Sequence, residues 1–249
     1  MKSIVVIFPY FGKLPPQYNI WRASAIRNPS VDFMFFTDAE IAPYKNIIVH
    51  KMRFEDFRII VQKAFDFQII LDRPYKLCEY KPAYGYILKD YIKQYDFWGY
   101  GDLDLVYGDI RTFITDEVLK FKFILGWGHL SLFRNDSDTN EYFMKEENGF
   151  QKYTDAYTTR NITFFDYFSR YIIIRGGDAA ALTIGRVLDL LDAASLGIIY
   201  LHVIQPTCLG LRIRVPFLHR QVFPFLSLCE LFRCQQALSL DHPDQQDAC

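Results

Sequence analysis

The 249-residue sequence has no long hydrophobic run, little net charge and few cysteines. Each of these three features argues against one class of protein: membrane-spanning, nucleic-acid-binding or disulfide-rich. No window reaches the roughly 18 continuous apolar residues of a membrane-spanning helix, since the nearest one, 196–211, contains polar residues and a proline. A formal charge of -1 gives no overall attraction for nucleic acid. Five cysteines, four of them at or after position 208, form no even set for a disulfide framework. We therefore expect a cytoplasmic protein with reduced thiols that binds no nucleic acid.

Lysine is missing from the last part of the chain. Thirteen lysines occur up to Lys152 and none follows, whereas eight arginines lie beyond it. This change indicates either a distinct C-terminal module or a change of coding frame or assembly near residues 165–175. We expect one domain over 1–165 and a C-terminal segment over 166–249 of uncertain structure. That segment also holds a group of basic residues that could contact the inner face of a membrane, although such groups are commoner as ordinary surface: Arg212, Arg214, His219 and Arg220.

Hydrophobic residues, in contrast, make up 51% of the sequence, and their periodicity alternates along the chain. Continuous apolar runs predict buried strands, and apolar residues spaced three and four apart predict helices. The predicted strands are 3–8, 31–37, 46–50, 97–101, 121–127 and 130–134. The predicted helices are 17–27, 54–65, 81–92, which would begin at Lys81-Pro82, and 136–145. Strands alternating with helices predict an α/β fold with a mostly parallel central sheet and helices on both faces.

Two carboxylates, Asp102 and Asp104, follow the predicted strand 97–101. In an extended chain residues i and i+2 point to the same side, so both could bind one ion while Leu103 packs the other way. Oxygen ligands favour Mg²⁺ or Mn²⁺ over zinc. An Asp-x-Asp tripeptide also occurs in loops that cap a helix or lie in water, so the tripeptide alone leaves both interpretations open.

The positions of three residues point to one binding crevice. Tyr10, Asp38 and Asp102 each follow the carboxyl end of a different predicted strand. Ligands of open parallel sheets bind beyond these ends. We therefore expect the three residues to lie at one edge of the sheet.

Several segments resemble a known class of enzyme. Lys81-Pro-Ala-Tyr-Gly-Tyr followed by Tyr95-Asp-Phe-Trp-Gly-Tyr-Gly-Asp-Leu-Asp resembles the part of sugar-nucleotide glycosyltransferases of the GT-A fold in which a helix leads to a strand and an Asp-x-Asp motif. Ile7-Phe-Pro-Tyr-Phe-Gly, Phe35-Phe-Thr-Asp and Gly126-Trp-Gly-His are similar to a poorly characterised bacterial family of glycosyltransferases. The resemblance covers about residues 1–165 and implies a GT-A-like, Rossmann-like domain.

The resemblance also implies a function. A hexosyltransferase of this kind moves a sugar from a nucleotide-diphosphate donor to a glycan or lipid-linked acceptor, here in surface polysaccharide synthesis. Asp102 and Asp104 would hold Mn²⁺ or Mg²⁺, which offsets the charge that grows on the leaving diphosphate. Tyr10 and Phe11 would stack on the base, and Asp38 would accept hydrogen bonds from base or ribose. Thr37 would also belong to the nucleotide-sugar site, and Lys81 would contact the phosphates as a cation.

Each of these residues also has an ordinary structural interpretation. Tyr10 and Phe11 could be core rings, Asp38 could cap a turn, and Lys81 could be a solvated residue of a helix. Asp109 and His129 are the candidates for a catalytic role, although a helix cap is favoured for Asp109 and a single histidine is usually structural.

Two other functions remain open. A metal-dependent phosphohydrolase could use the same aspartates, but it would need further acidic or histidine ligands at strand ends. A sugar-nucleotide-binding module without catalytic activity would keep the donor site alone.

Overall fold

The computed structural model describes residues 1–125, 130–145, 152–165 and 181–183. The chain divides into two compact units, Met1–Val203 and Ile204–Cys249, and all of the described residues belong to the first. His129, four of the five cysteines and the basic group at 212–220 lie outside the described residues.

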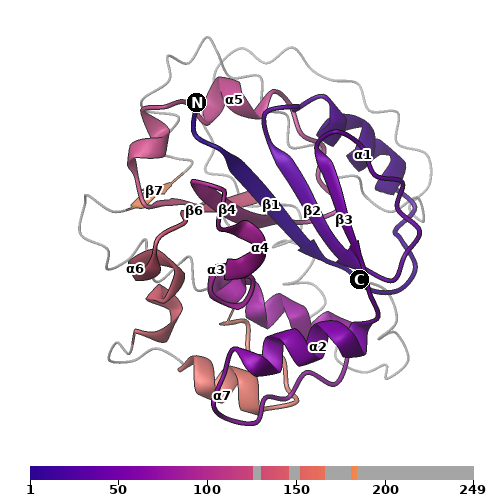
Figure 1. Ribbon diagram of the computed structural model, residues 1–249, viewed down its shortest axis with the longest axis vertical. Helices are drawn as coiled ribbons and strands as arrows, with labels where there is room; N and C mark the ends of the chain where they lie inside the picture. Colours follow the sequence, from indigo (N-terminus) through magenta and orange to yellow (C-terminus); the bar gives the residue numbers. More distant parts are fainter. Residues whose placement is uncertain (126–129, 146–151, 166–180, 184–249) are drawn as a thin grey trace, which may run out of the picture. The chain divides into compact units, whose positions relative to one another are not determined.

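A seven-stranded sheet in the order β3-β2-β1-β4-β6-β5-β7 forms the centre of this unit (Figure 1). Neighbouring strands from β3 to β4 are parallel, and β7 is parallel to β5, whereas β6 is antiparallel to both β4 and β5. The predicted α/β class with a mostly parallel sheet is therefore confirmed. The strands are β1 Ile4–Pro9, β2 Asp32–Thr37, β3 Ile47–Lys51, β4 Phe97–Gly101, β5 Phe123–Leu125, β6 Leu130–Arg134 and β7 Ala181–Thr183.

Two predicted helices differ from the structure. The expected helix start at Lys81-Pro82 lies inside a 3-10 helix that runs from Pro74 to Ala83. The α-helix begins only at Tyr84, and it is interrupted at Leu88, whose backbone is not helical. The helix expected over 136–145 divides at Glu141. The helices are α1 Tyr18–Ile26, α2 Phe54–Lys63, η1 Pro74–Ala83, α3 Tyr84–Ile87, α4 Lys89–Ile92, α5 Ile110–Phe113, η2 Val118–Lys120, α6 Ser137–Asn140, η3 Tyr142–Met144 and α7 Tyr153–Thr158.

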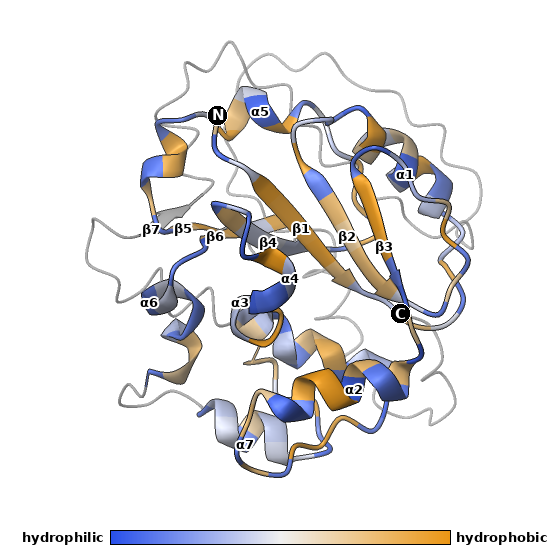
Figure 2. Ribbon diagram, in the orientation of Figure 1, coloured by the Kyte–Doolittle hydropathy of each residue, from blue (hydrophilic) through white to orange (hydrophobic). Residues whose placement is uncertain are grey.

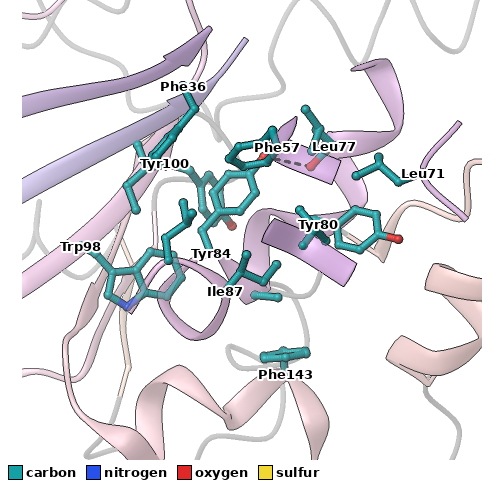
Figure 3. Close-up of a cluster of buried hydrophobic side chains, with 14 of the residues drawn as sticks. Phe36, Phe57, Leu71, Leu77, Tyr80, Tyr84, Ile87, Trp98, Tyr100 and Phe143 are labelled. Atoms are coloured by element: carbon teal, nitrogen blue, oxygen red, sulfur yellow. Dashed lines mark hydrogen bonds between the residues drawn. The ribbon is translucent and has the colours of Figure 1, made fainter. Parts of the chain in front are cut away.

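Hydrophobic side chains cover both faces of the sheet, because successive residues of a strand point to opposite sides. On one face Phe36 of β2 lies 5.3 Å from the ring of Phe57 in α2, centroid to centroid. On the other face Phe8 of β1 lies 5.1 Å from the Trp21 ring in α1. Figure 2 shows the hydrophobic colouring of β1, and Figure 3 shows the first of the two cores, with Tyr84 donating a hydrogen bond to the Leu77 carbonyl. Helices therefore cover both faces, as predicted.

Two glycines hold β4 in place. A Cβ atom on Gly99 would lie 2.2 Å from the Ser131 carbonyl oxygen of β6, and one on Gly85 would lie 2.3 Å from the Trp98 indole. Trp98 is fully buried, and its Nε1 donates to Asn140 Oδ1 at 2.6 Å. Only glycine, which has no side chain, allows β4 to lie this close to β6 and α3 to lie this close to β4.

None of the helices in the described part of the chain combines the length and apolar character needed to cross a membrane.

Candidate functional site

Strand register places the three predicted strand-end residues at one edge of the sheet. Pro9 pairs with Phe36, and Ile7 pairs with Tyr100. Tyr10, Asp38 and Asp102 follow these residues by one or two positions, and all three strands are parallel. The predicted meeting of these residues at one sheet edge is confirmed, and their chemical roles remain predictions.

The Asp-x-Asp motif lies in a turn directly after β4. The strand ends at Gly101, and Leu103 and Asp104 form a turn instead of continuing in extended form. Burial still alternates, because Leu103 and Leu105 are buried in the core while Asp102 and Asp104 are half-buried. Leu103 therefore lies in the core as expected, whereas the turn removes the extended geometry from which a shared direction of the two carboxylates was predicted.

Lys81 at the end of η1 is the cation beside this motif. Its Nζ atom donates to Asp102 Oδ1 at 2.8 Å and lies 5.6 Å from the centroid of the buried Tyr100 ring. The Lys81 side chain is 17% exposed and that of Asp102 is 37% exposed, so the pair is partly shielded from water. The contact brings a lysine ammonium and an aspartate carboxylate together at the sheet edge.

The two carboxylates fit one mode of metal binding. Among the described residues no group of three or more His, Cys, Asp or Glu is placed to hold an ion. Mg²⁺ in phosphate-transferring sites is commonly bound by one or two carboxylates together with substrate phosphates and water. Asp102 and Asp104 supply two carboxylates of this kind, and their binding of Mg²⁺ or Mn²⁺ stays a prediction.

Asp38 connects the loops that follow β1 and β2. Its Oδ1 atom accepts a hydrogen bond of 2.7 Å from the amide of Gly12, whose φ of 100° is one that glycine adopts readily. Thr37 is buried, and its Oγ1 accepts from the Ala39 amide at 3.0 Å. Asp38 is exposed, so its carboxylate both shapes the edge of the site and contacts solvent there.

The two rings after β1 have different environments. Tyr10 is half-buried, its hydroxyl donates to the Lys13 carbonyl at 2.9 Å, and burial raises its pKa. Phe11 is buried, with its ring 5.5 Å from those of Phe54 and Phe57. Because the Phe11 ring packs in the core, Tyr10 is the ring of this pair that reaches the surface.

Asp109 is the N-cap of α5. Its carboxylate accepts a hydrogen bond from the Arg111 amide at 3.1 Å, which satisfies an amide left unpaired at the helix start. The favoured interpretation of Asp109 as a cap is confirmed.

Sequence reasoning missed a buried lysine on η1. Lys76 is fully buried, and its Nζ donates to the carbonyls of Ala156 at 3.0 Å and Asn161 at 2.6 Å. Burial lowers the pKa of Lys76. One turn later Tyr80 stacks on Tyr157 of α7, with ring centroids 4.1 Å apart. Lysine is rarely buried unless paired, and the carbonyls that pair with it lie far away in sequence.

Glu79 on the same 3-10 helix was also missed. It is fully buried, and its carboxylate accepts hydrogen bonds from the amides of Thr163, Phe164 and Phe165 at 3.0, 2.8 and 3.4 Å. The Thr163 hydroxyl donates to it as well. The signal in the sequence was the pair of Lys76 and Glu79, three residues apart in a segment rich in tyrosine and apolar residues.

A cavity of about 350 Å³ lies elsewhere, between α2 and the chain before η1. None of the strand-end residues lines it, so it is separate from the candidate site. Its walls are Arg58, Ile59, Gln62, Gln68, Ile69, Ile70, Leu71, Asp72 and Arg160.

Comparison with known proteins identifies the family. Residues 6–177 match a family of unknown function, DUF6625, and the chain belongs to that family. The boundary expected at residue 165 therefore lies inside the matched range. No curated protein matches.

Two solved structures show partial similarity. One is a protein from Desulfovibrio desulfuricans G20 proposed to be a nucleotide-diphospho-sugar transferase, with 11% identity, a TM-score of 0.37, and coverage of 74% of this chain and 80% of that one. The other is the apo form of the glycosyltransferase GlyE of Streptococcus pneumoniae TIGR4, with 10% identity, a TM-score of 0.36, and coverage of 73% of this chain and 45% of that one.

Proposed function

We propose that the protein is a metal-dependent glycosyltransferase that takes a sugar from a nucleotide-diphosphate donor. The observation that carries this proposal is the contact between Lys81 and Asp102 in the turn after β4. It joins a cation suited to phosphate with one of two carboxylates suited to a divalent metal. Tyr10 and Asp38 lie at the same sheet edge and are the contacts that we propose for the nucleoside.

The reaction requires charge stabilisation at the diphosphate. The acceptor's hydroxyl oxygen bonds to the anomeric carbon of the donor sugar, the bond from that carbon to the phosphate oxygen breaks, and the nucleoside diphosphate and the hydroxyl proton leave as products. A divalent cation bound by the two carboxylates would supply Lewis-acid stabilisation of the leaving diphosphate.

Lys81 and the strand-end residues would bind and orient the donor. With a donor bound, Lys81 Nζ would exchange the Asp102 carboxylate for a phosphate oxygen as its partner. The exposed Asp38 carboxylate would accept a hydrogen bond from a ribose hydroxyl, and the Tyr10 ring would stack on the base. Together these contacts orient the anomeric carbon toward an acceptor.

The acceptor side of the proposal is a glycan or a lipid-linked sugar in surface polysaccharide synthesis. It is supported by the similarity of the segments at Lys81, Asp102 and Phe35 to glycosyltransferases. The donor sugar that we propose is a hexose, in line with the resemblance to hexosyltransferases.

Turnover of UDP- and GDP-sugars with Mn²⁺ tests the proposal. Asp104→Asn keeps the size of the side chain but removes its charge, and we expect donor hydrolysis to fall by about 100-fold or more, the scale of losing one charge-stabilising group. Asp90→Asn, at an exposed position of α4, is the matched control and should keep wild-type turnover. Equal turnover in Asp104→Asn and the wild type, with both proteins folded, would contradict the proposed metal-binding role of Asp104.

Two further outcomes distinguish the alternatives. Metal-dependent binding of UDP or GDP in calorimetry without turnover would identify a sugar-nucleotide-binding module. Release of phosphate from 4-nitrophenyl phosphate would identify a phosphohydrolase.

A further inference from the structure

We propose that Phe164 is a sugar-binding residue that stacks on the apolar face of a pyranose acceptor, and that Glu79 is its positioning residue. The proposal rests on the proposed glycosyltransferase function. It adds the side of the site that the strand-end residues do not supply.

The backbone at Phe164 is held in an unusual conformation. Its φ is 61°, and it is the only residue other than glycine with a positive φ in the part of the chain that the structure describes. For a bulky side chain the left-handed region costs roughly 1–2 kcal/mol, and such strain persists only where the surroundings enforce it. At Phe164 the enforcing group is identifiable.

Glu79 is the group that enforces this turn. Its fully buried carboxylate receives the amides of three successive residues, 163 to 165, and the Thr163 hydroxyl. Charge-assisted hydrogen bonds are about twice as strong as neutral ones. Removing any of these donors would leave a buried carboxylate less compensated, which is costly. Four donors on one carboxylate outweigh the strain at a single residue.

The turn presents an aromatic ring at the surface. Phe164 is 55% exposed, although most of the other phenylalanines and both of the tryptophans in the described part of the chain are buried. A ring that is held outward at the expense of backbone strain is unlike an exposed side chain that happens to lie on a loop. An exposed flat apolar ring is suited to the C–H face of a pyranose, whose hydroxyls point outward around its rim.

The same 3-10 helix connects this ring to the donor site. Glu79, which holds the Phe164 turn, is two residues from Lys81, which contacts Asp102. Two residues span at most about 7 Å of chain. Lys76 on η1 adds a second attachment, because it holds the carbonyls of Ala156 and Asn161 before the turn. One short helix therefore carries both the carboxylate that holds the Phe164 turn and the lysine that contacts Asp102.

Binding of methyl glycosides tests the proposal. The probes are the methyl β-glycosides of glucose, galactose, mannose and N-acetylglucosamine, titrated into the full chain with UDP and Mn²⁺ and followed by saturation-transfer NMR. We expect at least one probe to bind the wild type. Phe164→Leu should weaken that binding about fivefold, because ring stacking contributes on the order of 0.5–1.5 kcal/mol. Phe164→Tyr keeps an aromatic ring and should bind as the wild type does. Tyr44→Leu, at an exposed ring in the loop before β3, is the control and should bind normally.

A second pair of variants separates binding from folding. Phe164→Gly removes the ring at a backbone geometry that glycine adopts without strain, so its melting temperature should equal or exceed that of the wild type while glycoside binding is lost. Glu79→Gln should weaken glycoside binding and leave the affinity for UDP and Mn²⁺ unchanged. A merely structural role would change both affinities together.

The outcomes also separate this proposal from the one it rests on. Unchanged glycoside binding in Phe164→Leu and Phe164→Gly, or no binding of any probe to the wild type, would overturn the role of Phe164. Loss of UDP and Mn²⁺ binding in the wild type itself, with glycoside binding intact, would overturn the donor site and leave the Phe164 site standing.

Discussion

Lys81 Nζ lies 2.8 Å from Asp102 Oδ1, and this contact joins the last turn of η1 to the turn after β4. In the proposed function both groups also contact ligands, Asp102 the metal ion and Lys81 the diphosphate. The lysine neutralises a carboxylate that would otherwise repel its neighbour Asp104. In the absence of ligands the pair therefore offsets one of the two carboxylate charges, and in the proposed function binding would exchange this contact for contacts to the ligands.

Replacement of Lys81 should change metal and nucleotide affinity in opposite directions. In Lys81→Gln the Asp102 carboxylate loses its ammonium partner, so we expect Mn²⁺ alone to bind several-fold more tightly. UDP in the presence of Mn²⁺ should bind about tenfold more weakly, because a phosphate-binding cation is missing. Mn²⁺ titration by electron paramagnetic resonance and calorimetry with UDP measure the two. Lys89→Gln, which also removes a lysine near a tyrosine ring, should change neither, and a parallel change in both affinities would contradict the exchange.

Replacement of Asp38 separates its hydrogen bond from its charge. Asp38→Asn keeps an oxygen that can accept from the Gly12 amide, so its stability should match that of the wild type. Asp38→Ala loses this bond, and we expect a loss of about 1 kcal/mol in the free energy of unfolding. Urea denaturation of the two variants measures this difference. Equal losses would show that the contact to Gly12 does not hold the loop.

Alanine at Gly99 should be far more harmful than alanine at Gly12. The new Cβ at position 99 would meet the Ser131 carbonyl at 2.2 Å, which forces β4 and β6 apart, and overpacking of this kind costs about 3 kcal/mol or more. At Gly12 nothing lies within 4 Å, and the cost comes from its φ of 100°, about 1 kcal/mol. Midpoints of urea unfolding compare the two variants, and similar midpoints would rule out the proposed clash.

Acidification should destabilise the protein through His50. Its ring stacks on Phe36 with centroids 4.9 Å apart and meets Tyr91 edge-on, and burial lowers its pKa below the ordinary value of about 6.5. Above that value His50 is neutral in both the folded and unfolded states. As the pH falls from about 6.5 through the lower folded pKa, the unfolded state binds the proton more readily and stability is lost.

His50→Phe keeps both ring contacts and removes the titration. We expect the melting temperature of the wild type to fall more between pH 7.5 and pH 5 than that of this variant, on a range set around the ordinary histidine pKa. Scanning calorimetry at several pH values measures the difference. The same pH dependence in both proteins would assign the acid sensitivity to other groups.

Local patterns predicted most of the sheet. The apolar run at 97–101 coincides with β4, and the run at 3–8 differs from β1 by one residue at each end, because burial on both faces leaves a continuous apolar signal. The cap at Asp109 followed from its residue type alone. Helix bounds after Arg73 were less accurate, since 3-10 geometry has no apolar period like that of an α-helix.

The sequence by itself determined the order of strands and helices and the position of Asp102 and Asp104 directly after β4, because these depend on residues near one another in the chain. Only the tertiary structure decided that Lys81 pairs with Asp102 and that Glu79 holds the amides of 163–165, more than eighty residues away. Those contacts arise when η1 packs beside both β4 and the segment after α7. A charged side chain carries no local mark of the partner that makes its burial favourable.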